Sequence, residues 1–542
     1  MLTKRLFFLF AFVDAISAST RAHQSCHETA AKLQLASTTI LFTSYHQKGE
    51  SIPLPGTAAS CSNTLANITA NLCRVVFDTA SSSSSSIRME AWLPDEWNGR
   101  FLATGGGGLG GCIDYPTVQN GASLGFATFG TNGGHNGSVG FDFFLNKSES
   151  IIDFGHRAIH IEAEVGKALS MQYYGSSPRF SYYVGCSTGG RQGLSTATHY
   201  PNDFDGMVVG APGVEWIRIV TQWYLMAQRF GWPNTNASEY VSFEQFQAIA
   251  SKIVELYDEV DGVKDGILDN PSHLHVDPQL FACGTGILNS SLCLKNAQQV
   301  RSFRLAYQPM VDLEGNFVYP GFPFGVDVTS FAQNEVNGSA FFPVTQVRDY
   351  FRGIVYNGSN WSDLSLTAAD VEYAVKLNAG LTNTGISEAQ LGKFREAGGK
   401  IISFHGRADQ KVPSELSEWY YNGAMANINA TLDDMHDFYR LFFIPGMAHC
   451  RTGPGAWNVG QVAPLDPNTT DAEHNTILAI QNWVEQGHAP DYLVGTKYQG
   501  DLVSSTIKSQ RKHCVYPLRS KWDGVGNTTD SSSWNCVAWD KY

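Results

Sequence analysis

Two residues that could act together as nucleophile and base lie far apart in this sequence, and each has a cysteine beside it. Ser187 follows Cys186, and His449 precedes Cys450. A serine and a histidine in hydrogen-bonding contact bring the neighbouring Cα atoms close to the roughly 5–6 Å that a disulfide requires. We therefore predict a Cys186–Cys450 disulfide that holds the hydroxyl of Ser187 beside the imidazole of His449.

The sequence around Ser187 has the pattern of a nucleophile elbow. Residues 185–189 are Gly-Cys-Ser-Thr-Gly, after a β-rich run at 180–184 and before a helix expected at 191–199. This G-x-S-x-G pattern places a serine on a tight turn between a strand and a helix. The N-terminus of that helix points at the site, and the amide of Thr188 can donate to an oxyanion. An ordinary turn at a strand end is the alternative.

The acid that would complete a triad follows a later predicted strand. In an α/β-hydrolase the order along the chain is serine, acid, histidine, and each residue follows a strand. Asp409 follows the strand expected at 400–405, and His449 follows the one expected at 438–444. We predict that Asp409 orients His449, whereas His405 is structural. A turn or a helix cap is the other role open to Asp409.

A glycine-rich loop offers a second hydrogen-bond donor for an oxyanion. Residues 104–111 are Thr-Gly-Gly-Gly-Gly-Leu-Gly-Gly, at the end of a strand expected at 100–104. Backbone without side chains can approach a tetrahedral oxygen closely, so we predict that Gly107 or Gly108 supplies the amide. Phosphate binding fits less well, because the loop lacks the lysine of a P-loop.

Alternating strands and helices indicate the fold class. Residues 88–211 and 400–444 alternate β-rich runs with helical segments, which predicts an α/β-hydrolase fold with a mostly parallel sheet covered on both faces. A chain of 542 residues exceeds what one hydrophobic core usually holds. We assign residues 19–224 and 396–542 to the catalytic domain. Residues 225–395 are assigned to a large inserted lid over the carboxyl edge of the sheet.

An acidic loop in the predicted lid has donors for a hard cation. A helix expected at 242–257 leads into Asp-Glu-Val-Asp-Gly-Val-Lys-Asp-Gly-Ile at 258–267. Oxygen ligands suit calcium, and we predict that this loop binds a structural Ca²⁺. The predicted ligands are the side chains of Asp258, Asp261 and Asp265 and the carbonyls of Val263 and Ile267. A solvated acidic turn is the alternative, because the loop lacks the EF-hand pattern.

The N-terminus and the composition indicate an extracellular protein. Residues 1–18 combine basic residues, an apolar run and small residues, which predicts a cleaved signal peptide. Eleven N-x-S/T sequons agree with a glycosylated, secreted protein. The net charge of −13 argues against nucleic acid and anionic membranes as partners. The sequence leaves the oligomeric state open.

The ten cysteines can be oxidised in such a compartment. Besides Cys186–Cys450, short spacings suggest the pairs Cys283–Cys293 and Cys514–Cys536. The other four would join the N-terminal region through one of three possible pairings; they are Cys26, Cys61, Cys73 and Cys112. The clustered cysteines and histidines of a zinc site are absent from the sequence.

Together these features resemble the tannase and fungal feruloyl esterase family over nearly the whole predicted mature chain. Members are similar in the Cys-Ser and His-Cys pairs, the disulfide that joins them, the order of the triad and a D-G-V-x-D-G calcium loop in a lid. The resemblance implies catalysis by Ser187, Asp409 and His449, and a bound calcium. Tyr257 stands where members commonly carry a cysteine, so this loop has fewer cross-links. The length and the segment 283–293 are closer to type B feruloyl esterases than to tannases.

The resemblance implies a secreted serine carboxylesterase that hydrolyses feruloyl, or other hydroxycinnamoyl, esters of plant cell-wall polysaccharides such as xylan. Its substrate would be a phenolic ester linked to a polysaccharide or a small alcohol, and an acyl-enzyme would form on Ser187. Aromatic residues of the lid region are candidates for contact with the phenolic ring, although core positions suit them equally; they are Trp216, Trp223, Phe230 and Trp232. Two alternatives stay open: a tannase that hydrolyses galloyl esters, and a non-catalytic, calcium-stabilised glycan-binding protein.

Overall fold

A nine-stranded sheet forms the centre of the protein. The computed structural model describes residues 26–61, 63–311, 315, 317–327, 332–333, 342–343, 345–461, 470–503 and 505–539. The predicted signal peptide, residues 1–18, lies outside the described residues. In sheet order the strands are β1 (Thr38–His46), β4 (Leu72–Ala80), β5 (Ser86–Pro94), β7 (Ala127–Thr131), β6 (Arg100–Thr104), β8 (Phe180–Cys186), β9 (Gly206–Gly210), β14 (Lys400–Gly406) and β15 (Tyr439–Ile444).

Most of this sheet is parallel. From β7 through β15 each strand pairs in parallel with its neighbour, and this confirms the predicted α/β-hydrolase fold. At the other edge β1, β4 and β5 pair antiparallel, and β5 also pairs antiparallel with β7. The serine-rich loop at 81–85 joins β4 to β5 as a hairpin. The segments of β1 and β4 lie outside those that the sequence pattern predicts as strands.

Alternate residues of each parallel strand enter two separate cores. Phe101, Tyr183 and Val209 point to one face, whereas Leu102 and Val208 point to the other. This period of two is what a sheet covered on both sides requires. One face packs against α4 (Ala158–Tyr174), α5 (Thr188–His199) and α12 (Glu415–Asn427), and the other packs against α2 (Tyr115–Ser123) and α14 (Thr476–Gln486).

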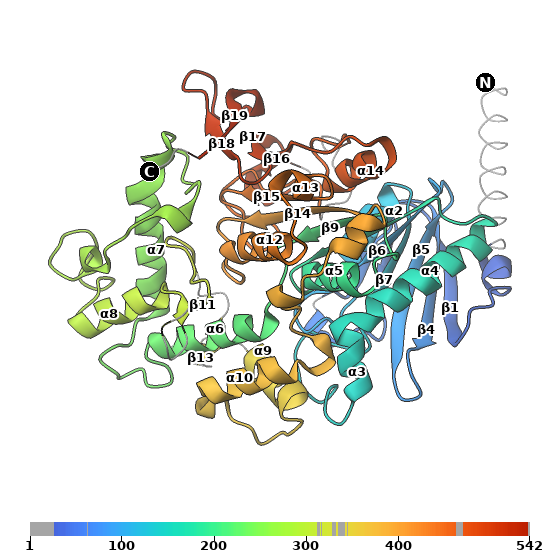
Figure 1. Ribbon diagram of the computed structural model, residues 1–542, viewed down its shortest axis with the longest axis horizontal. Coiled ribbons are helices and arrows are strands. Elements are labelled where there is room, and N and C mark those ends of the chain that lie inside the picture. Colours follow the sequence, from blue (N-terminus) through green and yellow to red (C-terminus); the bar gives the residue numbers. More distant parts are fainter. Residues whose placement is uncertain are drawn as a thin grey trace, which may run out of the picture.

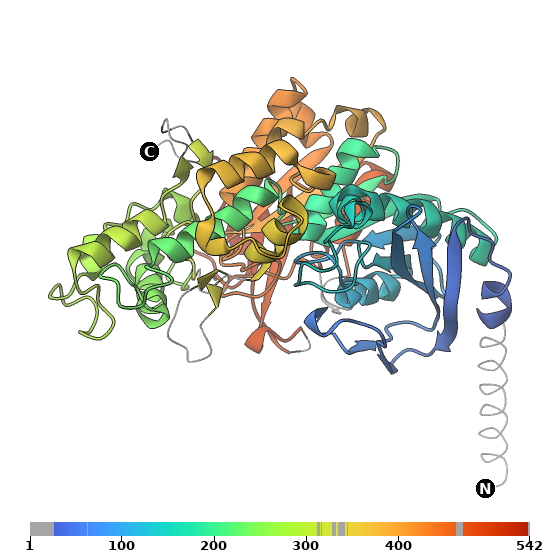
Figure 2. The same ribbon diagram turned by 90° about the horizontal axis from the view of Figure 1, so that it is seen from below.

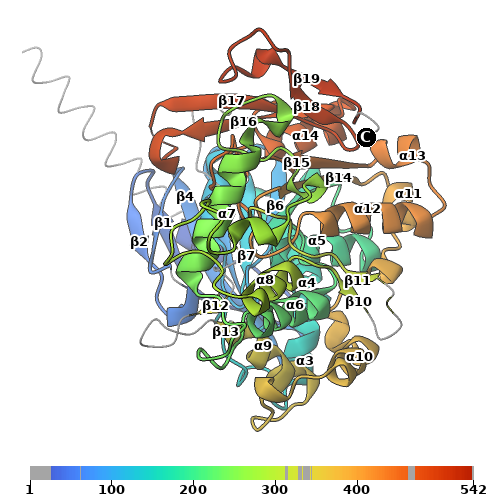
Figure 3. The same cartoon turned by 90° about the vertical axis from the view of Figure 1, so that its left-hand side faces the viewer.

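The described part of the segment predicted as a lid lies beside the sheet, at the left and bottom of Figure 1, where it is coloured green to yellow. The same arm of helices extends from the catalytic domain in Figure 2, and α7 stands in front of the sheet in Figure 3. The lid helices are α6 (Trp216–Arg229), α7 (Phe243–Tyr257), α8 (Ala297–Ala306), α9 (Thr345–Tyr350) and α10 (Ala368–Leu377). The predicted domain boundary at 224/225 falls inside α6, which therefore belongs to both parts.

Short strands complete the lid and the N- and C-terminal regions. Two-stranded ladders pair β2 (Ser51–Pro53) with β3 (Leu65–Asn67), β10 (Met310–Val311) with β11 (Phe317–Tyr319), and β12 (Ala332–Gln333) with β13 (Phe342–Pro343). Near the C-terminus β16 (Tyr492–Tyr498) pairs with β17 (Ile507–Cys514), and β18 (Arg519–Trp522) pairs with β19 (Trp534–Val537). Within the described residues no helix is both long and apolar enough to span a bilayer.

Five disulfides connect these parts. Cys186–Cys450 joins the end of β8 to the loop after β15, as predicted from the two pairs of neighbours. Cys283–Cys293 and Cys514–Cys536 close local loops. Among the three possible N-terminal pairings, the structure contains Cys26–Cys73 and Cys61–Cys112. The second of these links the N-terminal segment to the residue that follows the glycine-rich loop.

Candidate active site

Ser187 occupies a strained turn between β8 and α5. Its backbone has φ 63° and ψ −120°, a region that non-glycine residues rarely adopt and that is characteristic of a nucleophile elbow. Helix α5 begins at Thr188, three residues earlier than predicted, because glycines allow its first turn to pack closely. A Cβ on Gly189 would lie 3.0 Å from the Gly106 carbonyl oxygen, and one on Gly190 would lie 2.5 Å from that of Gly210. The first turn of α5 therefore packs directly against the glycine-rich loop and the end of β9.

The loop after β15 carries His449 to the elbow. The Cys186–Cys450 disulfide holds the two segments with a Cα–Cα distance of 6.0 Å. Cys450 has φ 65°, so the chain turns sharply directly after the histidine. The backbone amide of His449 donates to Oε1 of Gln410 at 3.0 Å. The histidine is therefore fixed by a covalent link on one side and by a hydrogen bond on the other.

Asp409 lies behind His449 and is fully buried. Its Oδ2 accepts a hydrogen bond from Nδ1 of His449 at 2.7 Å, and its Oδ1 accepts from the amides of Lys411 at 2.8 Å and Val412 at 2.9 Å. Burial alone would raise the pKa of Asp409, but the neighbouring His449 charge and the hydrogen bonds from His405 and His449 hold it well below its ordinary value. The carboxylate therefore stays ionised and keeps the Nδ1–H tautomer of His449 in place.

Ser187 and His449 line one cavity of about 600 Å³. Trp216 and Trp223 of α6 also line it, together with Gln346 of α9, so the lid region forms part of the wall. The other two aromatic candidates lie elsewhere. Phe230 is fully buried and packs edge-on against Phe246, whereas Trp232 packs against Tyr224.

The glycine-rich loop meets the elbow across the same cavity. Gly107 and Gly108 line the cavity, and the Thr188 hydroxyl donates to the Gly108 carbonyl. On its other side the loop is held by Gln192 of α5, whose Oε1 accepts from the Gly106 amide at 3.1 Å. These two contacts fix the predicted donor loop relative to the Ser187 turn, as an oxyanion site requires.

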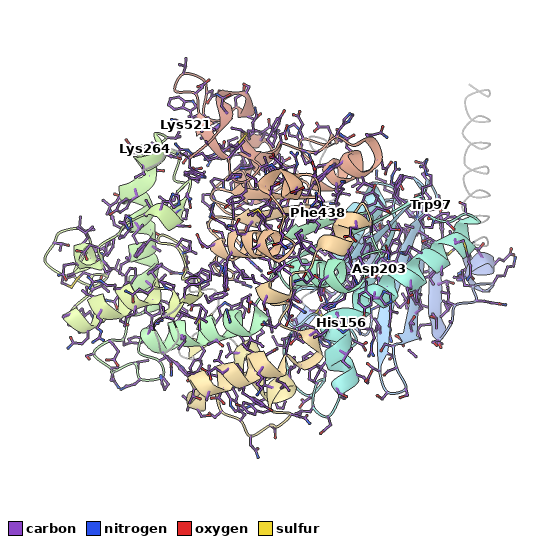
Figure 4. All side chains as sticks on the ribbon, viewed as in Figure 1. Trp97, His156, Asp203, Lys264, Phe438 and Lys521 are labelled. Carbon is purple, nitrogen blue, oxygen red and sulfur yellow. A yellow bond between two sulfur atoms is a disulfide. The ribbon has the colours of Figure 1, made fainter. Side chains whose placement is uncertain are left out.

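The predicted calcium loop follows α7 at the far end of the lid. Lys264, labelled at the upper left of Figure 4, marks this loop, and Lys521 of β18 lies near it in that view. Asp258 Oδ1 accepts hydrogen bonds from the amides of Asp265, Gly266 and Ile267. Asp258 therefore closes the loop on itself, a role that the sequence pattern did not distinguish from ion binding.

Two other carboxylates of the loop, those of Asp261 and Asp265, are poorly solvated. Asp261 Oδ2 is buried and has no hydrogen-bond partner in the described part of the chain. Burial, as the largest cause, raises the pKa values of Asp261 and Asp265 to about 6. Carboxylate and carbonyl oxygens are the ligand type that calcium takes, but no cluster of three or more His, Cys, Asp or Glu side chains with metal-site geometry occurs among the described residues. The carbonyls of Val263 and Ile267 stay predicted ligands.

Two glutamines of the site escaped the sequence analysis. Gln410 binds the His449 amide and lines the cavity, and Gln192 binds the glycine-rich loop. Gln410 directly follows Asp409, so a search of the residues next to the predicted acid could find it. Gln192 carries no such signal, because only the packing of α5 on the glycine-rich loop gives it a partner.

The chain matches a known protein family over most of its length. The family model described as "Tannase and feruloyl esterase" matches residues 73–537. A protein described as probable feruloyl esterase B-2 of Aspergillus fumigatus is 36% identical over 531 residues, which cover 98% of each chain. The predicted resemblance is therefore confirmed.

Solved structures agree with this assignment. The crystal structure of feruloyl esterase B from Aspergillus oryzae superposes with a TM-score of 0.87 at 33% identity, covering 95% of this chain and 100% of that one. Tannin acyl hydrolase from Aspergillus niger shares the fold, with a TM-score of 0.74 at 22% identity over 94% of each chain. The chain belongs to the tannase and feruloyl esterase family of carboxylic ester hydrolases.

Proposed function

We propose that the protein is a serine carboxylesterase that works through an acyl-enzyme on Ser187. One observation carries the proposal: Ser187 and His449 line the same cavity, their neighbours are joined by a disulfide, and the histidine is hydrogen-bonded to the buried Asp409. These are the nucleophile, base and orienting acid of acyl transfer. Their order along the chain is the one usual for an α/β-hydrolase.

The chemistry follows from these positions. His449 Nε2 takes the proton of the Ser187 hydroxyl as its oxygen attacks the ester carbonyl, and the amides of Thr188 and of Gly107 or Gly108 stabilise the oxyanion. His449 then gives the proton to the departing alcohol. Water, deprotonated by the same imidazole, releases the free acid and restores the serine. Asp409 stays ionised and stabilises the imidazolium.

The proposed substrates are feruloyl and related hydroxycinnamoyl esters of plant cell-wall polysaccharides such as xylan. Support comes from the names of relatives that are about one third identical over nearly the whole chain. Trp216 and Trp223 line the cavity and supply aromatic contact for a phenolic ring. A galloyl ester is the second candidate, since a tannin acyl hydrolase shares the fold. A non-catalytic glycan-binding role is disfavoured by membership of a family of hydrolases.

We further propose that the protein is secreted and that its lid carries a structural calcium. The five disulfides suit an oxidising compartment, in keeping with the predicted signal peptide at residues 1–18. Asp258, Asp261 and Asp265, with the carbonyls of Val263 and Ile267, would hold the ion. Calcium would neutralise the buried Asp261 oxygen, and no step of ester hydrolysis depends on it.

Hydrolysis of methyl ferulate and methyl gallate by the same purified protein tests the proposal. A higher kcat/KM for methyl ferulate is expected, and a preference for methyl gallate would replace the substrate assignment while retaining the mechanism. In Ser187→Ala, kcat should fall by roughly 10⁴-fold or more, and labelling by a fluorophosphonate should be lost. Thr198→Ala, on the same helix, is the matched control and should retain both. Turnover by Ser187→Ala near the wild-type rate would refute the mechanism.

A further inference from the structure

A second buried histidine contacts the acid of the proposed triad. His405 lies near the end of β14, four residues before Asp409, and its side chain has no exposed surface. Its Nε2 lies 3.2 Å from Oδ2 of Asp409, the same oxygen that accepts from His449 Nδ1. The sequence interpretation of His405 as purely structural does not account for this contact.

The surroundings of His405 determine which ring nitrogen carries the proton. Nε2 faces two groups that only accept hydrogen bonds, the Val412 carbonyl at 3.0 Å and the Asp409 carboxylate at 3.2 Å. Nδ1 lies 2.7 Å from the Ser417 hydroxyl, which can act as a donor. The neutral ring therefore carries its proton on Nε2 and accepts the Ser417 proton at Nδ1. This tautomer directs an N–H group at Asp409.

The contact completes the hydrogen bonding of the Asp409 carboxylate. Oδ1 accepts from two backbone amides, those of Lys411 and Val412, and Oδ2 accepts from His449 and lies 3.2 Å from Nε2 of His405. The two amides and the His405 ring belong to the end of β14 and the turn that follows it, so the fold fixes them in a frame. The remaining contact of the carboxylate is with His449. The carboxylate cannot rotate away from His449 without breaking contacts in this frame.

The shared oxygen also affects how strongly Asp409 stabilises the His449 cation. A carboxylate oxygen that already accepts one N–H is a weaker acceptor for a second, because each donor withdraws negative charge. His405 should therefore weaken the hydrogen bond that Asp409 Oδ2 accepts from His449. A general base is most effective when its pKa lies near the working pH.

We propose that His405 is a positioning residue of the triad, whose Nε2–H fixes the Asp409 carboxylate and limits its basicity toward His449. The inference rests on the proposed function, because it assumes that His449 is the base. Among the described residues, Glu415 of α12 interacts electrostatically with His405 and pairs with Arg407 at 3.7 Å, and the buried Tyr319 of β11 interacts with Asp409. They are unchanged in the variants below and give the same electrostatic background.

Two substitutions of His405 distinguish the effect of its N–H donor from the effect of its ring packing. His405→Phe keeps a planar ring but offers no donor, and the shared oxygen becomes more basic. In the pH profile of kcat/KM, the acid limb should then move to higher pH by about one unit. This shift corresponds to the free energy of about one charge-assisted hydrogen bond. At a pH on that limb, kcat/KM should fall on the order of 10-fold. His405→Gln carries an amide N–H at the position of Nε2 and should return the limb toward wild type.

His513→Phe is the matched control, since it makes the same change at another buried histidine. His513 is fully buried and its Nε2 lies 2.8 Å from the Ala456 carbonyl; it belongs to β17, outside the site. The control should lose stability without moving the limb. An unmoved limb in His405→Phe, or an equal shift in His513→Phe, would overturn the inference. If His449→Ala retained turnover, the proposed function itself would fail instead.

A measurement on the wild-type protein covers the case in which His405→Phe does not fold. Imidazole ¹⁵N NMR reports which nitrogen of each histidine is protonated, and the signals of His405 are identified by their loss in His405→Gln. The Nε2–H tautomer is expected across the range in which the enzyme is active. A ring protonated at Nδ1 alone would place no donor toward Asp409 and would refute the proposal.

Discussion

Removal of the Cys186–Cys450 disulfide should reduce activity by more than its effect on stability explains. The bridge closes a loop with a sequence separation of 264, for which chain entropy gives a stabilisation of about 5–6 kcal/mol. The Cys283–Cys293 bridge closes a separation of only 10, which gives about 3 kcal/mol. Both double alanine variants should therefore unfold at lower urea concentration, the first by more.

The two variants should differ sharply in catalysis under conditions in which both stay folded. Without the bridge, His449 is held by its hydrogen bonds to Asp409 and Gln410, and a displacement of about 1 Å costs on the order of 10²-fold in rate. The assay is kcat for a 4-nitrophenyl ester without urea, with folding checked by circular dichroism. The Cys283→Ala/Cys293→Ala control should retain wild-type kcat. Near-normal kcat in folded Cys186→Ala/Cys450→Ala would refute the view that the disulfide positions the base.

Three further perturbations test other parts of the site. Asp409→Asn should lower kcat by about 10⁴-fold, because an amide can stabilise the wrong tautomer of His449. Stopped-flow acylation rates measure this loss, and a loss below 10-fold would contradict the proposed role of Asp409. Thr188→Val removes the hydroxyl that binds the Gly108 carbonyl, so kcat should fall about 10-fold with little change in KM. A change in KM alone would contradict a role of this hydroxyl in positioning the glycine-rich loop. For the lid, the raised pKa values of about 6 at Asp261 and Asp265 mean that ionisation destabilises the metal-free fold as the pH rises from about 4 to 6. EDTA should therefore lower Tm more at pH 7.5 than at pH 4.5, where protonated carboxyls bind calcium weakly, and an equal effect at both values would argue against the site.

Features set by neighbouring residues were predictable from the sequence. Ser242 forms the capping box with Gln245 at the start of α7, and β6 spans residues 100–104 as predicted. The elbow and the two Cys-flanked residues were found because their chemistry requires short, fixed spacings. The family assignment follows from the same short motifs.

Features that depend on packing between distant segments were not predictable in this way. The start of α5 at Thr188 is possible because the glycine-rich loop and the end of β9 leave room for glycines only. Gln192 acquires its partner through the contact of α5 with a loop 86 residues earlier, and His405 meets Asp409 through the turn that follows β14. Asp258 shows the same limit: its type suggested an ion ligand, whereas the folded loop uses one of its oxygens to bind three amides.

The position of the lid in the strand order has a consequence for the diversity of the family. The whole segment between Gly210 and Lys400 is the crossover connection of two neighbouring parallel strands, β9 and β14. A crossover only has to leave one strand and enter the next, so its length and content can change without altering any strand pairing. Relatives can therefore remodel the wall of the proposed substrate cavity while the proposed catalytic residues, which all follow strands of the sheet, keep their places.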